Sequence, residues 1–173
     1  MAVTITRTAL TDDDGTGTTG TVLNNAFKTQ LYDQIDVALA TLNTAIGAVG
    51  AWTTVTFAAG NFTAQAGTWT VTAGQQTTYA YAVLGKTMVL AFCINGGTVS
   101  ATPTYLAMAI PGGYSTVGDI RCTYYYSANA AATWQVGQAV VAATTVNLYR
   151  DPAPTLWAAA VVYVQGQITF RVA

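Results

Sequence analysis

Hydrophobic and polar residues follow three different patterns along the chain. Residues 1–20 are polar and rich in Thr, Asp and Gly, and residues 21–50 carry apolar side chains every three or four positions. Residues 51–173 consist of short apolar segments separated by turn-forming residues. A spacing of three to four residues indicates an amphipathic helix, and short alternating segments indicate strands. The pattern therefore predicts an extended arm, a short helical neck and a β knob, in that order.

The neck, residues 21–50, has a regular apolar stripe. Between Ile35 and Val49 the spacing alternates between four and three residues, as it does at the a and d positions of a coiled coil. We expect the neck to be coiled-coil-like and trimeric, and a single amphipathic helix packed on the knob is the alternative. The predicted contact residues of the trimer are Leu31, Ile35, Leu39, Leu42, Ile46 and Val49.

The arm, residues 1–20, has two parts. Its residues with expected roles are Val3, Ile5, Arg7, Asp12, Asp13 and Asp14. The first three alternate with threonines, which fits a short strand or an extended segment. The three aspartates are followed by glycines and are typical of a solvated turn. A cation site is the alternative, although an EF-hand loop would space its acidic ligands at alternate positions and end in Glu.

The knob, residues 51–173, has many short strand-like segments joined by turns. We predict strands at 52–58, 68–72, 76–84, 86–95, 104–110, 119–126, 133–142, 144–149 and 157–172. Asn95-Gly96-Gly97 and Pro111-Gly112-Gly113 are typical of turns, and Gln165-Gly166-Gln167 is expected to break the last strand. This density of strands predicts a mainly β fold, an antiparallel β-sandwich or jelly roll.

Some of the predicted strands are apolar on both faces. In segment 86–95, Met88, Leu90, Phe92 and Ile94 alternate with Val89, Ala91 and Cys93. A sheet with one face in water should instead alternate apolar and polar residues. Charged residues make up 8% of the chain, so few are available to cover a second face. Because obligate interfaces are more apolar than ordinary surface, we expect a homotrimer in which another subunit covers the second face.

The composition excludes several kinds of chemistry. The chain has no His and no Glu, and it carries six basic and seven acidic residues. Without His, neither a Ser-His-Asp triad nor a His-ligated metal can form. Six basic residues cannot neutralise many phosphates of a nucleic acid. We therefore expect no enzymatic activity, no cofactor, no metal and no nucleic-acid partner.

Two further features bear on membranes and disulfides. The N-terminal residues lack the apolar core of a signal peptide, and the uncharged segment 37–60 contains Asn43, five Thr and three Gly. A bilayer span needs roughly 20 predominantly apolar residues, so we expect no membrane insertion. Cys93 and Cys122 lie in apolar segments and are predicted to be buried free thiols, with a disulfide between neighbouring strands as the alternative.

Aromatic and charged residues of the knob are the candidates for a binding surface. The aromatic candidates for a receptor or glycan contact are Tyr124, Tyr125, Tyr126 and Trp134. Core or interface packing is the alternative for each of them. Asp119 and Arg121 share one face of a regular strand. Asp119 and Asp151 form the candidate carboxylate pair that a glycan-degrading enzyme would need.

Two segments resemble parts of phage proteins. Residues 7–27, RTALTDDDGTGTTGTVLNNAF, resemble the N-terminal docking segments of phage structural proteins. Residues 81–113 resemble a pattern in the knobs of phage fibres, where Y-x-x-x-G-K-x-x-x-x-x-F leads through a glycine turn to I-P-G-G. The matching residues are Tyr81, Gly85, Lys86, Phe92, Ile110, Pro111, Gly112 and Gly113. The layout thus resembles a small trimeric fibre or spike protein of a tailed bacteriophage.

This resemblance implies a homotrimer that is made in the host cytoplasm and resides in the virion. The arm would bind other virion proteins, and the knob would contact a glycan or protein of the bacterial surface. A purely structural capsid decoration, head-fibre or connector protein is the alternative. A glycan-degrading enzyme is the remote alternative.

Overall fold

The structure, a computed structural model, describes residues 25–128 and 133–173. The chain divides into two compact units, Met1–Val49 and Gly50–Ala173, which we call the helical unit and the β unit. The described elements are α1 (Asn25–Ala48), β1 (Thr53–Thr54), η1 (Ala59–Asn61), β2 (Phe62–Ala64), β3 (Trp69–Thr70), β4 (Gln76–Leu84), β5 (Thr87–Val99), β6 (Leu106–Ala109), η2 (Pro111–Gly113), β7 (Ile120–Ala128), β8 (Gln135–Ala142), β9 (Thr145–Tyr149) and β10 (Val161–Arg171).

Helix α1 has 24 residues and is therefore about 36 Å long. The hydroxyls of Thr41 and Thr44 donate to the carbonyls of Val37 and Ala40, one turn earlier, so these polar groups are satisfied within the helix itself. No helix in the described ranges combines the length and the hydrophobicity that a bilayer span requires.

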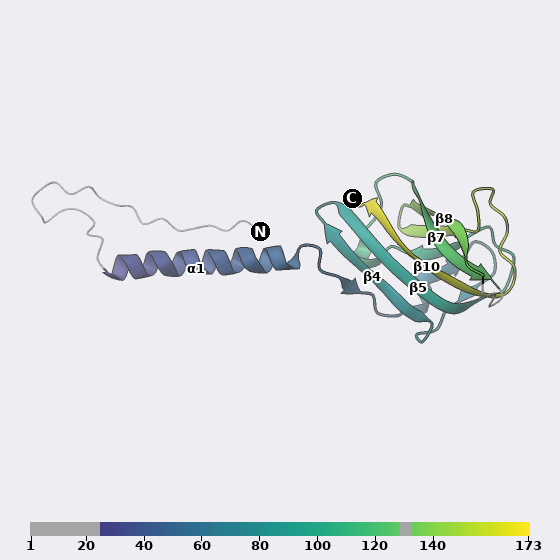
Figure 1. Cartoon of the computed structure of the whole chain (residues 1–173), viewed down its shortest axis with the longest axis horizontal. Helices are drawn as coiled ribbons and strands as arrows, with labels where there is room; N and C mark the ends of the chain where they lie inside the picture. The colour runs from purple at the N-terminus through teal and green to yellow at the C-terminus, as the bar shows by residue number, and fades with distance from the viewer. Residues whose placement is uncertain (1–24, 129–132) are drawn as a thin grey trace, which may run out of the picture. The chain divides into compact units, whose positions relative to one another are not determined.

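The ten described strands belong to one antiparallel sheet. Its order is β1-β4-β5-β10-β7-β8-β9-β6-β2, with β3 paired to β5. The sheet curls on itself as a half-barrel, and Figure 1 shows β4, β5, β10, β7 and β8 side by side across it. A mainly β fold is thus confirmed, but the hydrogen bonds join all these strands into one curled sheet instead of the two separate sheets expected from the sequence.

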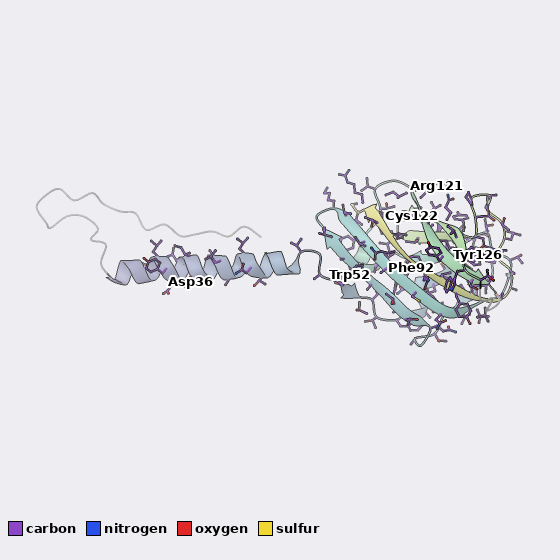
Figure 2. All side chains as sticks on the ribbon, in the orientation of Figure 1. Asp36, Trp52, Phe92, Arg121, Cys122 and Tyr126 are labelled. Atoms are coloured by element: carbon purple, nitrogen blue, oxygen red, sulfur yellow. The ribbon has the colours of Figure 1, made fainter. Side chains whose placement is uncertain are left out.

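The core fills the inside of this curl (Figure 2). The predicted face of segment 86–95 is confirmed, because Met88, Leu90, Phe92 and Ile94 are all buried. The largest fully buried side chains are Trp157, Tyr79, Tyr124, Met88, Leu90, Ile94, Leu106, Met108, Leu148, Ile168, Val99 and Val141. Aromatic residues contribute much of this core, and each buries a large apolar area.

The sequence analysis predicted a turn at Asn95-Gly96-Gly97, and this prediction is wrong. Strand β5 continues through it, and the pairing with β10 shifts register there, so that Gly96 is the extra residue of a β-bulge. Gly96 has φ +94°, a conformation that favours glycine in bulges as well as in turns. A methyl group on Gly97 would lie 2.5 Å from Nε1 of Trp69, so glycine is needed there for close packing.

Strands β10 and β2 also differ from what the sequence analysis expected. Strand β10 runs unbroken through Gln165-Gly166-Gln167, and a methyl on Gly166 would lie 3.0 Å from Phe92 and Tyr124. This glycine therefore makes room for the ring of Phe92 and the Cβ of Tyr124, and it does not end the strand. Strand β2 was not predicted. It has three residues and is paired with β6, which follows it far along the chain.

Two buried tyrosines have hydroxyl groups bonded to backbone carbonyls. Tyr79 donates to the carbonyl of Ala109, and Tyr124 donates to that of Tyr149 at 3.0 Å. Burial raises the pKa of Tyr79. Burial also raises the pKa of Tyr124, to which the nearby Tyr126 adds, while Arg150 opposes the shift. Both side chains are consequently neutral hydrogen-bond donors in the folded protein.

We expect the β unit to lose stability as the pH rises above about 10, where tyrosines of the unfolded chain begin to ionise. The folded state retains these two protons, so raising the pH favours unfolding. The stabilisation of the folded state by these two protonated tyrosines is complete below that pH. It is lost as the pH rises through the pKa values that the tyrosines have in the folded state. Each tyrosine adds up to about 1.4 kcal/mol per pH unit to the slope. Unfolding free energies between pH 7 and 12 should therefore fall less steeply in Tyr79→Phe, and equal slopes would contradict the prediction.

Candidate functional site

The predicted trimer contacts lie along one side of α1. At 100° per residue, Leu31, Ile35, Leu39, Leu42 and Ile46 fall within an arc of about 80°. Leu39 is 51% exposed and Leu42 49% exposed, and Leu31 and Ile35 are also exposed. The side chain of Ile46 lies outside the described residues, and Val49 is exposed just beyond the end of the helix. The described part of the helical unit thus leaves an apolar surface exposed from Leu31 to Leu42.

The aromatic candidates of the β unit divide into two groups. Tyr124 and Tyr126 are buried in the core, whereas Tyr125 is 53% exposed and Trp134 is 46% exposed. Successive side chains of a strand alternate between its faces, so Tyr125 lies on the opposite face of β7 from its two neighbours. Burial leaves Tyr124 and Tyr126 no surface for a receptor contact, so Tyr125 and Trp134 remain the accessible candidates.

The outer face of β4, β5 and β10 is uncharged in its middle rows, and Arg171 lies on this face only at the end of β10. Ala80 of β4 is paired with Ala91 of β5, and Ala91 is paired in turn with Gln167 of β10. In the next row of the same face, Ala82 is paired with Val89. Ala82 is buried, and Val89 and Ala91 are half-buried. A sheet face in water usually carries polar side chains. On this face Gln167 and Thr169 of β10 are polar, whereas Ala80, Ala82, Val89 and Ala91 form an apolar patch on β4 and β5 that has the chemistry of a contact surface.

A polar cleft of about 390 Å³ lies on the outer face of β7, β8 and β9. Its polar lining residues are Asp119, Arg121, Gln138, Asn147 and Tyr149. Register brings them together, because Gln138 is paired with Tyr149, and Val140 is paired with both Arg121 and Asn147. Arg121 Nη1 donates to Oε1 of Gln138 at 2.8 Å. Figure 2 labels Arg121 at the periphery of the β unit.

The wall of this cleft is a loop held by its own hydrogen bonds. Pro152 and Pro154 line the cleft. Asp151 Oδ1 accepts from the backbone N–H groups of Ala153, at 2.9 Å, and Thr155, at 3.2 Å. Hydrogen bonds from Thr155, through its side chain and its backbone, hold the pKa of Asp151 below its usual value, with Ala153 and Arg150 adding to the effect. Asp151 therefore fixes the loop as a carboxylate and is poorly suited to act as a general acid with Asp119.

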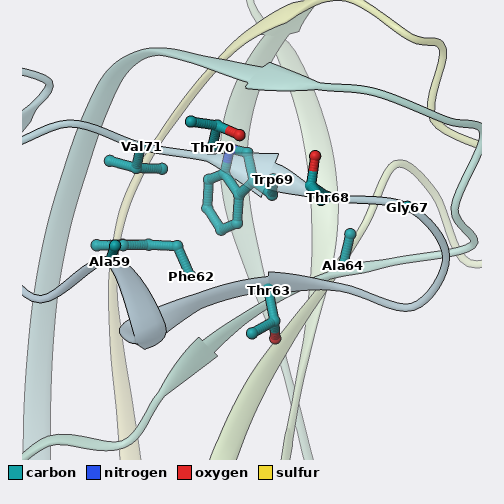
Figure 3. Close-up of a pocket in the computed structure, with 9 residues that line it drawn as sticks. All are labelled: Ala59, Phe62, Thr63, Ala64, Gly67, Thr68, Trp69, Thr70 and Val71. Carbon is teal, nitrogen blue, oxygen red and sulfur yellow. The ribbon is translucent and has the colours of Figure 1, made fainter.

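A second cleft, of about 400 Å³, lies between β2 and β3 (Figure 3). Phe62, Trp69 and Val71 supply apolar walls, and threonine hydroxyls lie among the other lining groups. The rings of Phe62 and Trp69 are in edge contact, with centroids 5.4 Å apart. Nε1 of Trp69 is buried without a hydrogen-bond partner, and it lies against Gly97 of β5. The cleft offers no ionisable lining group, so its chemistry is that of a packing gap.

The remaining predicted residues carry less information. The arm residues Val3, Ile5, Arg7, Asp12, Asp13 and Asp14 lie outside the described residues. Within the described ranges, no group of three His, Cys, Asp or Glu residues could hold a metal ion.

Cys93 and Cys122 are free and half-buried. They lie on β5 and β7, and β10 runs between these strands, so the suggested disulfide between neighbouring strands is not formed.

Sequence reasoning named Asp119 and Arg121 but missed Gln138, Asn147 and Tyr149. A signal for these residues exists, because each alternates with buried apolar residues along its predicted strand.

Comparisons of the chain with family models, with curated proteins and with solved structures found no match.

Proposed function

We propose that the chain is a structural protein of a bacteriophage virion, a homotrimeric fibre or spike. In this proposal the arm, residues 1–20, attaches to the particle, three copies of α1 form the neck, and the β unit is the knob that contacts the bacterial surface. The proposal includes no catalytic step, no cofactor and no nucleic-acid partner.

The apolar stripe of α1 is the observation that carries the proposal. Most helices in proteins are stabilised by packing an apolar face. The described side chains of the stripe are exposed, while by helix geometry Asp33 lies on the opposite side of the helix and Asp36 lies beside the stripe. Three such helices would bury their stripes in a common seam, as in a coiled coil. The apolar patch on the outer face of β4 and β5 would supply a second contact between copies.

The outer face of β7, β8 and β9 is the surface we propose for host contact. Tyr125 is paired with Val136 across these strands, and both are exposed. The polar cleft begins two residues further along β8, at Gln138, which is about 7 Å away. An exposed aromatic ring next to a polar cleft combines an anchor for packing with hydrogen-bonding groups, and both are typical of recognition surfaces.

Binding of the full-length protein to cells tests the host-contact role. We expect fluorescently labelled wild type to bind cells of some strains in a broad bacterial panel, and Tyr125→Ala to weaken that binding at least about tenfold. Trp52→Ala, which removes an equally exposed aromatic side chain elsewhere on the β unit, should bind like wild type. Trimeric protein that binds no strain, and without which particles adsorb normally but are less stable, would favour the purely structural role.

A further inference from the structure

We infer that the polar cleft on β7, β8 and β9 is a binding site for an uncharged saccharide, with Asp119, Arg121, Gln138, Asn147 and Tyr149 as its hydrogen-bonding groups. The inference rests on the proposed role of the β unit as the host-contacting part. It adds the ligand class and the residues that bind it.

The cleft contains a carboxylate and a guanidinium group that do not neutralise each other. Arg121 donates to the neutral amide of Gln138 at 2.8 Å and not to Asp119. The carboxylate of Asp119 therefore remains available as an acceptor, and the other N–H groups of Arg121 remain available as donors. Each hydroxyl of a sugar both donates and accepts, so neighbouring hydroxyls can bridge such a pair of groups.

The neutral residues extend the same pattern. Asn147 Oδ1 accepts from Thr145 Oγ1 at 3.2 Å, which leaves its NH₂ group to donate toward the cleft. Tyr149 is half-buried, and its ring packs against Tyr105 with centroids 5.3 Å apart, so its position is fixed. The cleft thus offers acceptors and donors on rigid neighbouring strands.

The charges of the cleft favour a ligand without net charge. One Asp and one Arg line it, so an anionic or cationic ligand would be attracted by one group and repelled by the other. Apolar surface from Val140, Pro152 and Pro154 lies among the polar groups. A pyranose ring presents C–H faces together with hydroxyl edges, and this mixed surface fits the mixture of groups in the cleft.

The cleft is preorganised before any ligand binds. Asp151 fixes the loop that carries Pro152 and Pro154. Arg150 Nη1 donates to the carbonyl of Leu156 at 3.0 Å, which closes the same loop. Because the groups are already in place, little ordering cost accompanies binding.

Saturation-transfer NMR with the full-length protein tests the inference. The probes are glucose, galactose, mannose, rhamnose and N-acetylglucosamine at millimolar concentration, with glucuronic acid as an anionic probe. We expect signals from at least one neutral sugar, and a loss of affinity of about tenfold or more in Arg121→Ala and in Asp119→Asn. Gln138→Ala is the second variant and should weaken binding less. Arg171→Ala, which removes an exposed Arg outside the cleft, is the matched control and should bind like wild type.

The possible failures separate this inference from the proposed function. Wild type that binds no neutral sugar, or that binds only glucuronic acid, overturns the saccharide site even if the protein still binds cells. Sugar binding that survives both Arg121→Ala and Asp119→Asn places the site elsewhere and also overturns it. Sugar binding that depends on the cleft, in a protein that binds no cells, supports the site and contradicts the host-contact role.

Discussion

Replacing Leu39 and Leu42 together by Asp is expected to lower the native mass from three times 18.0 kDa to 18.0 kDa. In a trimeric neck the two substitutions place six carboxylates in one apolar seam. Burying an unpaired charge costs several kcal/mol, which is a large part of the stability that a short coiled coil can have. The mass is measured by light scattering on a size-exclusion column.

The same variant should also lose helical content. Most of the stability of a helix in a protein comes from packing its apolar face, and the separated neck loses that packing. The far-ultraviolet circular dichroism signal of α1 should therefore decrease, while the signal of the β unit remains. The two measurements together distinguish dissociation of the neck from unfolding of the whole chain.

The matched control places the same two charges on the other side of the helix. Val37 is 67% exposed, and Val37 and Ala40 lie roughly opposite the centre of the stripe. Val37→Asp with Ala40→Asp should leave the mass at three times 18.0 kDa. If wild type is a well-behaved monomer, or if both double variants assemble equally, the trimeric neck is wrong.

Local patterns in the sequence were sufficient to predict most strands. The segment 76–84 coincides with β4, because alternating side chains and flanking turns are local signals. The turn at Pro111-Gly112-Gly113 is confirmed as η2, where both glycines have φ near +75°. The same reasoning failed at Gly96, because a positive φ serves a bulge as well as a turn, and the partner strand decides which of the two forms.

The cleft could be predicted only in part, because it depends on pairing between strands. Sequence alternation placed Asp119 and Arg121 on one face, but it gave no register between β7, β8 and β9. That register brings Gln138 beside Tyr149 and positions both next to Arg121. Likewise, the position of β10 between β5 and β7 joins strands that are far apart in sequence, and no local pattern encodes it.

Trp157 connects the core to the loop that walls the cleft, and its replacement should have the largest effect on the stability of the β unit. The side chain is fully buried, and its Nε1 donates to the carbonyl of Leu148 at 3.1 Å. Its ring meets that of Tyr126 edge-on, with centroids 5.1 Å apart. Trp157→Ala would leave a cavity and remove this buried hydrogen bond.

We expect Trp157→Ala to lower the unfolding free energy by about 3–5 kcal/mol, measured by urea denaturation at a fixed protomer concentration. Trp157→Phe keeps a ring but loses the N–H group, so it should cost less. Trp134→Ala removes the same side chain from an exposed position and should change stability by no more than about 0.5 kcal/mol. Equal losses at positions 134 and 157 would show that the buried indole does not anchor the loop. If it does anchor the loop, Trp157→Phe should also weaken sugar binding, although Trp157 does not line the cleft.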